Sequence, residues 1–219
     1  MSGFDPTSAR LLPQSFFSRE AAGVARDLLG CVLVSRVGGV VVAGEIVETE
    51  AYLGADDPGS HAATRGVTAR NRVMYGPPGH AYVYFTYGNH HMLNLVAEPE
   101  GTAGAVLMRA LRPLVGEDVM SARRGGREGV ELTNGPGKLA AALGVDLTHN
   151  GMALGGTLAV YAGTPIGNER VGVSGRIGLS DGYELPLRFY IEGERHVSKG
   201  RTGPGPRSRG AGRRRKGDA

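Results

Sequence analysis

Two acids and a tyrosine alternate along one segment of the sequence. Glu48, Glu50 and Tyr52 stand two residues apart in GEIVETEAYLG, and side chains in a strand repeat every two residues, so all three would share a face. A carboxylate in such a place can orient and deprotonate a water molecule. Two carboxylates whose backbone positions are roughly 6 to 7 Å apart, from a rise of about 3.3 Å per residue, could also form the acid pair of a carbohydrate hydrolase.

Tyrosines gather further along the chain. Four of the eight tyrosines fall between residues 75 and 87. Tyr82 and Tyr84 would share a strand face, and Tyr87 directly precedes Gly88–Asn89, a pair typical of a hairpin tip. Tyrosines in strands are commonly half-buried packing residues, so this pattern alone does not predict a site.

The surroundings of these tyrosines lack acids. Residues 58–97 contain no Asp or Glu, but they contain Arg65, Arg70, Arg72 and four histidines. Such a stretch suits polyanions and flat bases, because cations attract phosphates and tyrosine rings stack on bases. The sequence therefore favours a nucleic-acid site here.

Three other interpretations explain less of the pattern. A carbohydrate site usually includes tryptophan, and this chain has none. The spacing of His61, His80, His90 and His91 matches no familiar metal site, so we expect no metal. An RNA-binding sheet could use the tyrosines of YVYFTY for stacking, but it would leave Glu50 without a role.

Several ordered motifs together resemble the alkyladenine (3-methyladenine, or methylpurine) DNA glycosylase family. They are TEAY at residues 49–52, His61, RN at residues 70–71 followed by Met74, YVYFTYG at residues 82–88, Asn94, LMRAL around Arg109, GPGKL at residues 135–139, RIG at residues 176–178 and LPLRF at residues 185–189. These motifs span most of residues 15–198, so coincidence is improbable although each tetrapeptide alone is weak.

The resemblance implies a DNA-repair enzyme that needs no cofactor. Its substrate would be double-stranded DNA containing alkylated or deaminated purines, among them 3-methyladenine, 7-methylguanine, hypoxanthine and ethenoadenine. The damaged base is turned out of the helix, because a base inside the stack cannot be reached. The family's catalytic positions correspond to Glu50, which activates water, and Arg109, near the water and a phosphate; such an enzyme is monofunctional, with no lyase step.

The resemblance also assigns roles to the binding residues. Tyr52, His61 and Tyr84 would form the pocket walls, Asn94 would crowd the amino group of normal guanine, and Tyr87 would be the wedge that fills the vacated gap. The further expected DNA contacts are Asn89, His90, Arg65, Arg70, Arg72 and Lys138. Asn89 stands where the family usually has methionine, which predicts a smaller apolar wedge.

Length and composition agree with a small enzyme. The 219 residues suffice for one domain with a sizeable core. The single cysteine, Cys31, lies in an apolar run and suits a reducing compartment. No leader peptide or membrane-spanning run is visible, so we expect a soluble, monomeric protein in the cytoplasm, associated with the nucleoid if bacterial.

Charge divides the chain unevenly. Residues 195–219 hold nine Lys or Arg and one acid, whereas residues 1–194 hold 16 basic and 20 acidic side chains. The sequence therefore predicts an N-terminal arm at 1–14, a glycosylase domain at 15–198 and a disordered basic tail at 199–219. The tail would be either a phosphate tether or a solubilising end.

Periodicity and turn residues predict a single mixed α/β (α+β) domain with a curved, mainly antiparallel sheet and peripheral helices. Helices are expected at 18–29, capped by Ser18 and ended by Gly30, at 115–124 and at 137–143. Strands are expected at 31–37, 40–51 with a bulge at Gly44, 81–87, 91–96, 105–111, 158–161 and 188–191. The glycine- and proline-rich connection at residues 53–79 predicts a long irregular loop, and such loops inside compact domains are usually functional.

Overall fold

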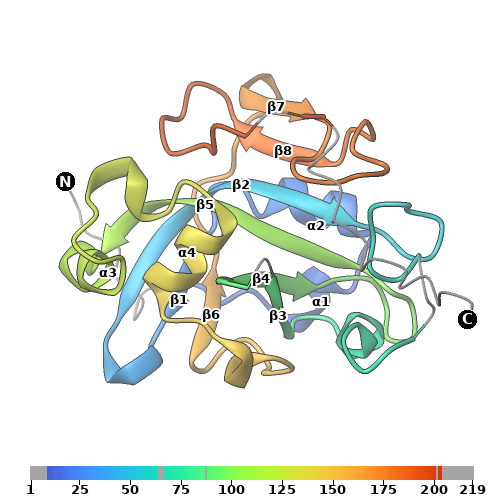
Figure 1. Ribbon diagram of the computed structural model, residues 1–219, viewed down its shortest axis with the longest axis horizontal. Helices are drawn as coiled ribbons and strands as arrows, with labels where there is room; N and C mark the ends of the chain where they lie inside the picture. Colours follow the sequence, from blue (N-terminus) through green and yellow to red (C-terminus); the bar gives the residue numbers. More distant parts are fainter. Residues whose placement is uncertain (1–8, 64–66, 87, 201, 204–219) are drawn as a thin grey trace, which may run out of the picture.

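A computed structural model describes residues 9–63, 67–86, 88–200 and 202–203 of the chain. Its centre is one sheet, in which six strands follow the order β3-β4-β5-β2-β1-β6 and β8 joins β2 to β7. Every pairing between these strands is antiparallel. Helix α4 crosses in front of the sheet and α2 lies behind β2 (Figure 1). The predicted mixed α/β domain with an antiparallel sheet is thus confirmed.

The strands are β1 (Val32–Ser35), β2 (Val42–Tyr52), β3 (Ala81–Thr86), β4 (His90–Val96), β5 (Ala105–Val115), β6 (Leu158–Tyr161), β7 (Val171–Ser174) and β8 (Arg188–Ile191). The helices are α1 (Gln14–Phe17), α2 (Ala21–Asp27), α3 (Glu117–Arg123) and α4 (Pro136–Leu143). Both β6 and β8 have the predicted bounds. Strand β7 was not predicted, because its short VGVS sequence sits among glycines and gives little periodic signal.

The predicted start of the helix at residues 18–29 was wrong. Helix α2 begins only at Ala21, and Ser18 ends the preceding helix α1 instead of capping α2. The first free N–H of α2, on Ala21, donates to the carboxylate of Glu98 at 2.7 Å. A side chain 77 residues away therefore supplies the cap, which satisfies an otherwise unpaired helix-end donor. Gly30 follows α2 with a φ of +81°, as its predicted role requires.

Strand β2 is the axis of the sheet, and it is irregular where the acids lie. Its first part pairs with β1 and its second part, Glu48–Glu50, pairs with β8. Opposite β5 the register shifts on either side of Glu48, which leaves Val47 and Arg109 as extra residues in the two strands. Such bulges re-aim side chains near functional sites. A third shift lies at Gly44, near the predicted bulge, but the extra residue, Leu114, is on β5.

One apolar core joins the sheet to its helices. Val24 of α2 and Leu139 of α4 both belong to a buried cluster built on Leu33, Ile46 and Met108. The predicted helices at 115–124 and 137–143 are present as α3 and α4, and Gly144 ends α4 with a φ of +74°. None of the helices in the described ranges is long and apolar enough to cross a membrane.

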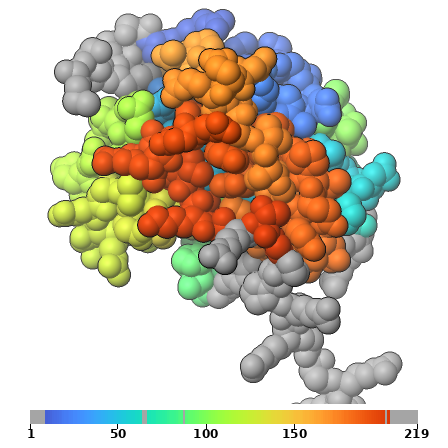
Figure 2. Space-filling view, turned by 90° about the horizontal axis from the view of Figure 1, so that it is seen from above, coloured from blue at the N-terminus to red at the C-terminus, as the bar shows by residue number. Residues whose placement is uncertain are grey.

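The C-terminal part of the domain extends the sheet beside the acids of β2. Residues in orange and red, from β7 through the segment after β8, occupy the centre of the molecular face shown in Figure 2. Within this region β8 pairs with Glu48–Glu50 of β2. The acids singled out in the sequence are therefore shielded from solvent by residues that follow them by more than a hundred positions.

Candidate active site

A small cavity of about 50 Å³ opens beside the tyrosine-rich hairpin. Its lining brings together all four residues expected to contact the base, from β2, β3, β4 and the long loop. The lining residues are Tyr52, Gly59, His61, Met74, Tyr82, Tyr84, Asn94, Ala105 and Leu179. None of them carries a formal charge when His61 is neutral, and five have aromatic or amide side chains suited to a flat heterocycle.

Aromatic rings meet one another across the cavity. The centroids of His61 and Tyr84 are 4.7 Å apart at 74°, and those of Tyr82 and Tyr84 are 5.4 Å apart at 42°. The ring of His61 also contacts the hydroxyl of Tyr82, with 3.0 Å between Nδ1 and the oxygen. Edge-on contacts of this kind favour aromatic pairs. The aromatic walls of the cavity therefore rest against each other.

Asn94 closes the cavity from β4. It lies opposite Tyr82 in the hairpin register and donates from Nδ2 to the Tyr82 carbonyl at 3.0 Å. Its side chain is buried, with an exposed fraction of 3% for the residue. The amide is thus held in one orientation by the neighbouring strand.

Glu50 is completely buried, and within the described ranges Tyr52 is the lining residue that connects it to the cavity. The Tyr52 hydroxyl donates to Oε2 at 2.9 Å, the Ile177 N–H donates to Oε1 at 2.7 Å, and a guanidinium nitrogen of Arg109 lies 3.2 Å from Oε1. A carboxylate can accept about four hydrogen bonds, so Oε2 keeps acceptor capacity for one more donor. The acid stands one residue behind the cavity wall and is not part of its lining.

Arg109 links Glu50 to Glu48. Its Nε donates to Glu48 at 2.8 Å and another of its nitrogens donates to Ser198 at 3.2 Å. Burial alone would lower the pKa of Arg109, but Glu50 and Glu48 raise it above its ordinary value. The arginine therefore stays charged, and its guanidinium is turned toward the acids. With 5% of the residue exposed, it is enclosed by these partners.

Glu48 is the most heavily bonded acid of the site. Besides Arg109, it accepts from Arg188 at 2.7 Å and from both the N–H and the hydroxyl of Ser198 at 2.6 and 2.8 Å. Burial by itself raises the pKa of Glu48, but Arg109, Arg188 and the Ser198 N–H together lower it below its ordinary value. Glu48 is therefore an ionised anchor that its partners enclose, and it does not line the cavity.

A second buried ion pair, Asp57–Arg176, lies against the wall residue Tyr52. Arg176, which is fully buried, donates to both oxygens of Asp57 at 2.5 and 2.6 Å. The centre of its guanidinium lies 4.8 Å from the centroid of the Tyr52 ring, a cation–π distance. Tyr52 thus contacts Arg176 with its ring and Glu50 with its hydroxyl.

Comparison with known proteins shows which protein family this chain resembles. Residues 15–195 match the profile of the methylpurine-DNA glycosylase family. A relative from Carboxydothermus hydrogenoformans, provisionally named 3-methyladenine DNA glycosylase, is 49% identical over 86% of this chain and 99% of its own length. Relatives with the same provisional name from Methanoculleus marisnigri and Chlorobaculum parvum are 50% and 47% identical, over 86% and 88% of this chain and 98% and 92% of their own.

The chain belongs to the methylpurine-DNA glycosylase family. Membership confirms the resemblance inferred from the motifs and the expected enzyme class, a hydrolase that cleaves N-glycosidic bonds in DNA. It also favours a DNA glycosylase over the other interpretations of the sequence.

The structure itself weighs against those other interpretations. Glu48 is closed off by two arginines and a serine, so it cannot act as the second acid of a carbohydrate hydrolase. Tyr82 and Tyr84 face the cavity instead of forming an open stacking platform for RNA. Within the described ranges, no three His, Cys, Asp or Glu side chains come together as metal ligands.

The expected DNA contacts of the glycosylase occupy different surroundings. Arg70 lies over the Tyr84 ring, 4.9 Å from its centroid, and Arg72 is exposed in the short turn Arg72–Tyr75. Asn89 and His90 are exposed at the hairpin. The predicted wedge, Tyr87, and the predicted contact Arg65 lie outside the described residues.

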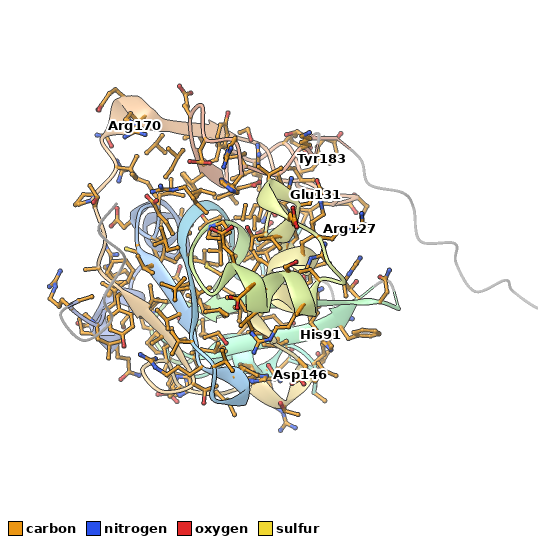
Figure 3. The ribbon with its side chains drawn as sticks, turned by 90° about the vertical axis from the view of Figure 1, so that its left-hand side faces the viewer. His91, Arg127, Glu131, Asp146, Arg170 and Tyr183 are labelled. Carbon is orange, nitrogen blue, oxygen red and sulfur yellow. The ribbon has the colours of Figure 1, made fainter. Side chains whose placement is uncertain are left out.

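Lys138 is close to the hairpin but already has partners. A Cβ atom on Gly137 would lie 2.8 Å from the His90 ring, so α4 begins against the hairpin. The amine of Lys138 donates to Glu131 and Asn134, both at 2.7 Å. Figure 3 places Glu131 and His91, a neighbour of His90, on the right-hand side of that view, with Arg170 at the opposite upper corner.

The sequence pattern does not predict several residues of the site. It places Tyr82 on the same strand face as Tyr84, but it does not predict that Tyr82 lines the cavity, as the structure shows. Asp57, Arg176 and Ser198 were missed as well. The RIG and LPLRF motifs carried a signal, since Arg176 and Arg188 stand in them, but only the folded chain shows which acids they meet.

His61 provides a test of the cavity's polarity. Burial, and next the charge of Arg70, lower the pKa of His61 from 6.5 to about 4. The folded state therefore favours the neutral ring, and this contribution to stability is present above pH 6.5 and is lost as the pH falls toward 4. We expect an NMR titration of the His61 ring to give a midpoint near 4.

The His61→Asn variant is the matched comparison for that titration. Between pH 6.5 and 4.5 the wild type should lose more free energy of unfolding than the variant, because only the wild type must keep an imidazole uncharged. Parallel losses in the two proteins, or a ring midpoint near 6.5, would show that the imidazole stays in contact with water.

Proposed function

We propose that the enzyme rotates an alkylated or deaminated purine out of double-stranded DNA into the aromatic cavity and hydrolyses its N-glycosidic bond with water activated by Glu50. The observation that carries this proposal is the hydrogen bond from the Tyr52 hydroxyl to Glu50, because it joins a cavity wall to a buried, ionisable acid. A flat base against that wall would bring its glycosidic bond near the acid.

The buried charges suit a water nucleophile. Oε2 of Glu50 has capacity for one more donor after Tyr52, which a water molecule could be. Arg109 would stabilise the carboxylate, and the carboxylate in turn suits the oxocarbenium-like sugar that forms as the bond breaks. Among the described residues, no lysine lines the cavity, which supports a monofunctional enzyme without an amine-dependent lyase step.

Entry of the base requires the walls to part. Ligand pockets usually measure about 300 to 1,000 Å³, whereas this cavity measures about 50 Å³. His61 sits on the long loop between β2 and β3, and its contact with Tyr84 is the one that a stacked base would replace. Bases that pair or stack poorly are cheaper to extract, so the cost of opening would favour damaged purines. The fixed amide of Asn94 would then reject normal guanine.

The surface around the hairpin would hold the DNA. Arg65, Arg70, Arg72, Asn89, His90 and Lys138 are the contacts we propose, as cations and hydrogen-bond donors toward the phosphates. Lys138 would exchange Glu131 for a phosphate. The enzyme would act as a monomer at the chromosome, with a domain at residues 15–198 flanked by the arm at 1–14 and the basic segment at 199–219, whose cations would add affinity that salt weakens.

Tyr87 is the proposed wedge, on the strength of the family motif. The Tyr87→Ala variant should bind DNA with an abasic-site mimic about 1 to 3 kcal/mol more weakly, the scale of one lost stacking contact. Fluorescence anisotropy at fixed salt measures this change, with His91→Ala on the same hairpin as the matched control. Unchanged affinity in the Tyr87 variant would remove the wedge from the mechanism.

A strand-nicking assay tests the function directly. Four duplexes, each with one 3-methyladenine, 7-methylguanine, hypoxanthine or ethenoadenine, are incubated with the enzyme, with and without a zinc chelator. We expect nicks only after alkali, insensitivity to the chelator, and no cleavage of undamaged duplex. Nicks before alkali would indicate a lyase, and intact strands with all four lesions would refute the function.

A further inference from the structure

Asp57 and Arg176 form a buried ion pair that the hydrolytic chemistry does not itself use. Arg176 is fully buried and Asp57 is 1% exposed. Removing such charges from water is costly, and a buried ion pair is often no more stable than an apolar replacement. Moreover, Nε of Arg176 has no hydrogen-bond partner among the described residues, which adds a further cost. Stability alone therefore does not account for the pair.

The pair fixes the two segments that carry cavity walls. Asp57 accepts the N–H groups of Leu53 and Gly59, both at 2.9 Å, which clips the start of the loop that leads to His61. Arg176 donates to the carbonyls of Ala51 at 3.0 Å and Gly182 at 2.9 Å. The end of β2 and the segment after β7 are thereby tied to one guanidinium.

The guanidinium is closely packed. A Cβ atom on Gly59 would lie 2.6 Å from a terminal nitrogen of Arg176 and 2.6 Å from a methyl carbon of Leu179, another cavity residue, so only glycine fits at this position. The centre of the guanidinium also lies 4.8 Å from the centroid of the Tyr52 ring. The Tyr52 ring is therefore supported by a planar cation with little space around it.

Two routes lead from Arg176 to the acid. Through the Tyr52 ring it orients the hydroxyl that donates to Oε2 of Glu50. Along the chain, its neighbour Ile177 donates its N–H to Oε1 of the same carboxylate at 2.7 Å. A small displacement of the arginine would move both donors, and misplacement by about 1 Å can cost roughly 100-fold in rate.

We propose that the Asp57–Arg176 pair positions Tyr52, and through Tyr52 the carboxylate of Glu50, for base excision. The inference rests on the excision activity proposed above. Asp57 and Arg176 are positioning residues, because neither lines the cavity. Burial raises the pKa of Asp57, but its bonds to Arg176 and the two N–H groups outweigh this effect and lower it, so the pair stays ionised at neutral pH.

The test uses substitutions of similar size that remove either the planar guanidinium or the carboxylate charge. Arg176→Lys keeps a cation opposite Asp57 but loses the planar fork, and Asp57→Asn keeps the shape but loses the charge. Each should lower the single-turnover excision rate by about 10- to 100-fold and change the affinity for an abasic-site mimic by less than about 3-fold. Rates are normalised to the folded fraction, which is measured by circular dichroism.

Arg123→Lys is the matched control. Arg123 also holds two backbone carbonyls, those of Val37 and Ala142, but it contacts no cavity residue in the described part of the chain. It should keep the wild-type rate within twofold whatever its melting temperature. A loss in this control as large as that of Arg176→Lys would show that any destabilised arginine site slows excision, and the proposal would be overturned.

A double-mutant cycle separates positioning from simple support. Tyr52→Phe removes the hydroxyl through which Arg176 would act, so Arg176→Lys should cost at least threefold less in that background than in the wild type. The same cycle is run with Asp57→Asn, which keeps the test available if Arg176→Lys does not fold. Losses that multiply without coupling, or variants as fast as an active wild type, refute positioning. An inactive wild type refutes the proposed function instead.

Discussion

The Glu50→Gln variant is expected to bind lesion-containing DNA with nearly wild-type affinity and to excise the base about 100- to 10,000-fold more slowly, the range typical of a lost general base. The amide has the same shape, its oxygen can still accept from Ile177 beside Arg109, and its NH2 group can donate to the Tyr52 hydroxyl, so the surrounding geometry should persist. It cannot deprotonate a water molecule. Single-turnover kinetics with hypoxanthine-containing duplex gives the rate, and anisotropy gives the affinity.

Glu45→Gln on the same strand is the control for this comparison. Glu45 pairs with the half-exposed Arg112 and contacts neither Glu50 nor the cavity lining in the described residues, so its rate should match the wild type. If Glu50→Gln excises within tenfold of the wild type, the acid has another role. In that case its enclosure behind Tyr52 would be structural, and the water would have to be activated elsewhere.

Four residues of the cavity lining could be predicted, because each stands in a local motif. Alternation in β2 and β3 places Tyr52 and Tyr84 on defined faces, and the motifs that resemble the family indicated His61 and Asn94 at the right spacing. Local pattern and local geometry agree here, since a strand keeps its period of two between bulges. The hairpin formed by β3 and β4 could be predicted for the same reason.

The support behind the cavity could not be predicted, because it depends on distant residues and on irregular register. Arg109 points at two acids because it is an extra residue in a bulge, and a bulge has no reliable sequence signal. The Glu98 cap of α2 and the contact of Ser198 with Glu48 join positions 77 and 150 residues apart. Such contacts exist only once the sheet has formed.

The network around Glu48 therefore predicts a large effect on folding. Glu48→Gln should lower the free energy of unfolding at pH 7 by about 3 to 5 kcal/mol, because it leaves Arg188 buried without its carboxylate and removes one of the two acids beside Arg109. Urea denaturation measures the change. The exposed pair of Glu45 and Arg112 should matter much less, so Glu45→Gln again serves as the control.

The pH dependence of this effect distinguishes a lost charge from a lost hydrogen-bond acceptor. The folded pKa of Glu48 lies below 4.5, its ordinary value, so the ionised carboxylate stabilises the fold fully above that pH and ceases to do so as the pH falls through the folded pKa. The difference between wild type and Glu48→Gln should shrink in that acidic range, because a protonated Glu48 resembles the amide. A difference that stays constant with pH would instead mean that the second acceptor oxygen, which the amide replaces with NH2, and not the charge makes this acid necessary.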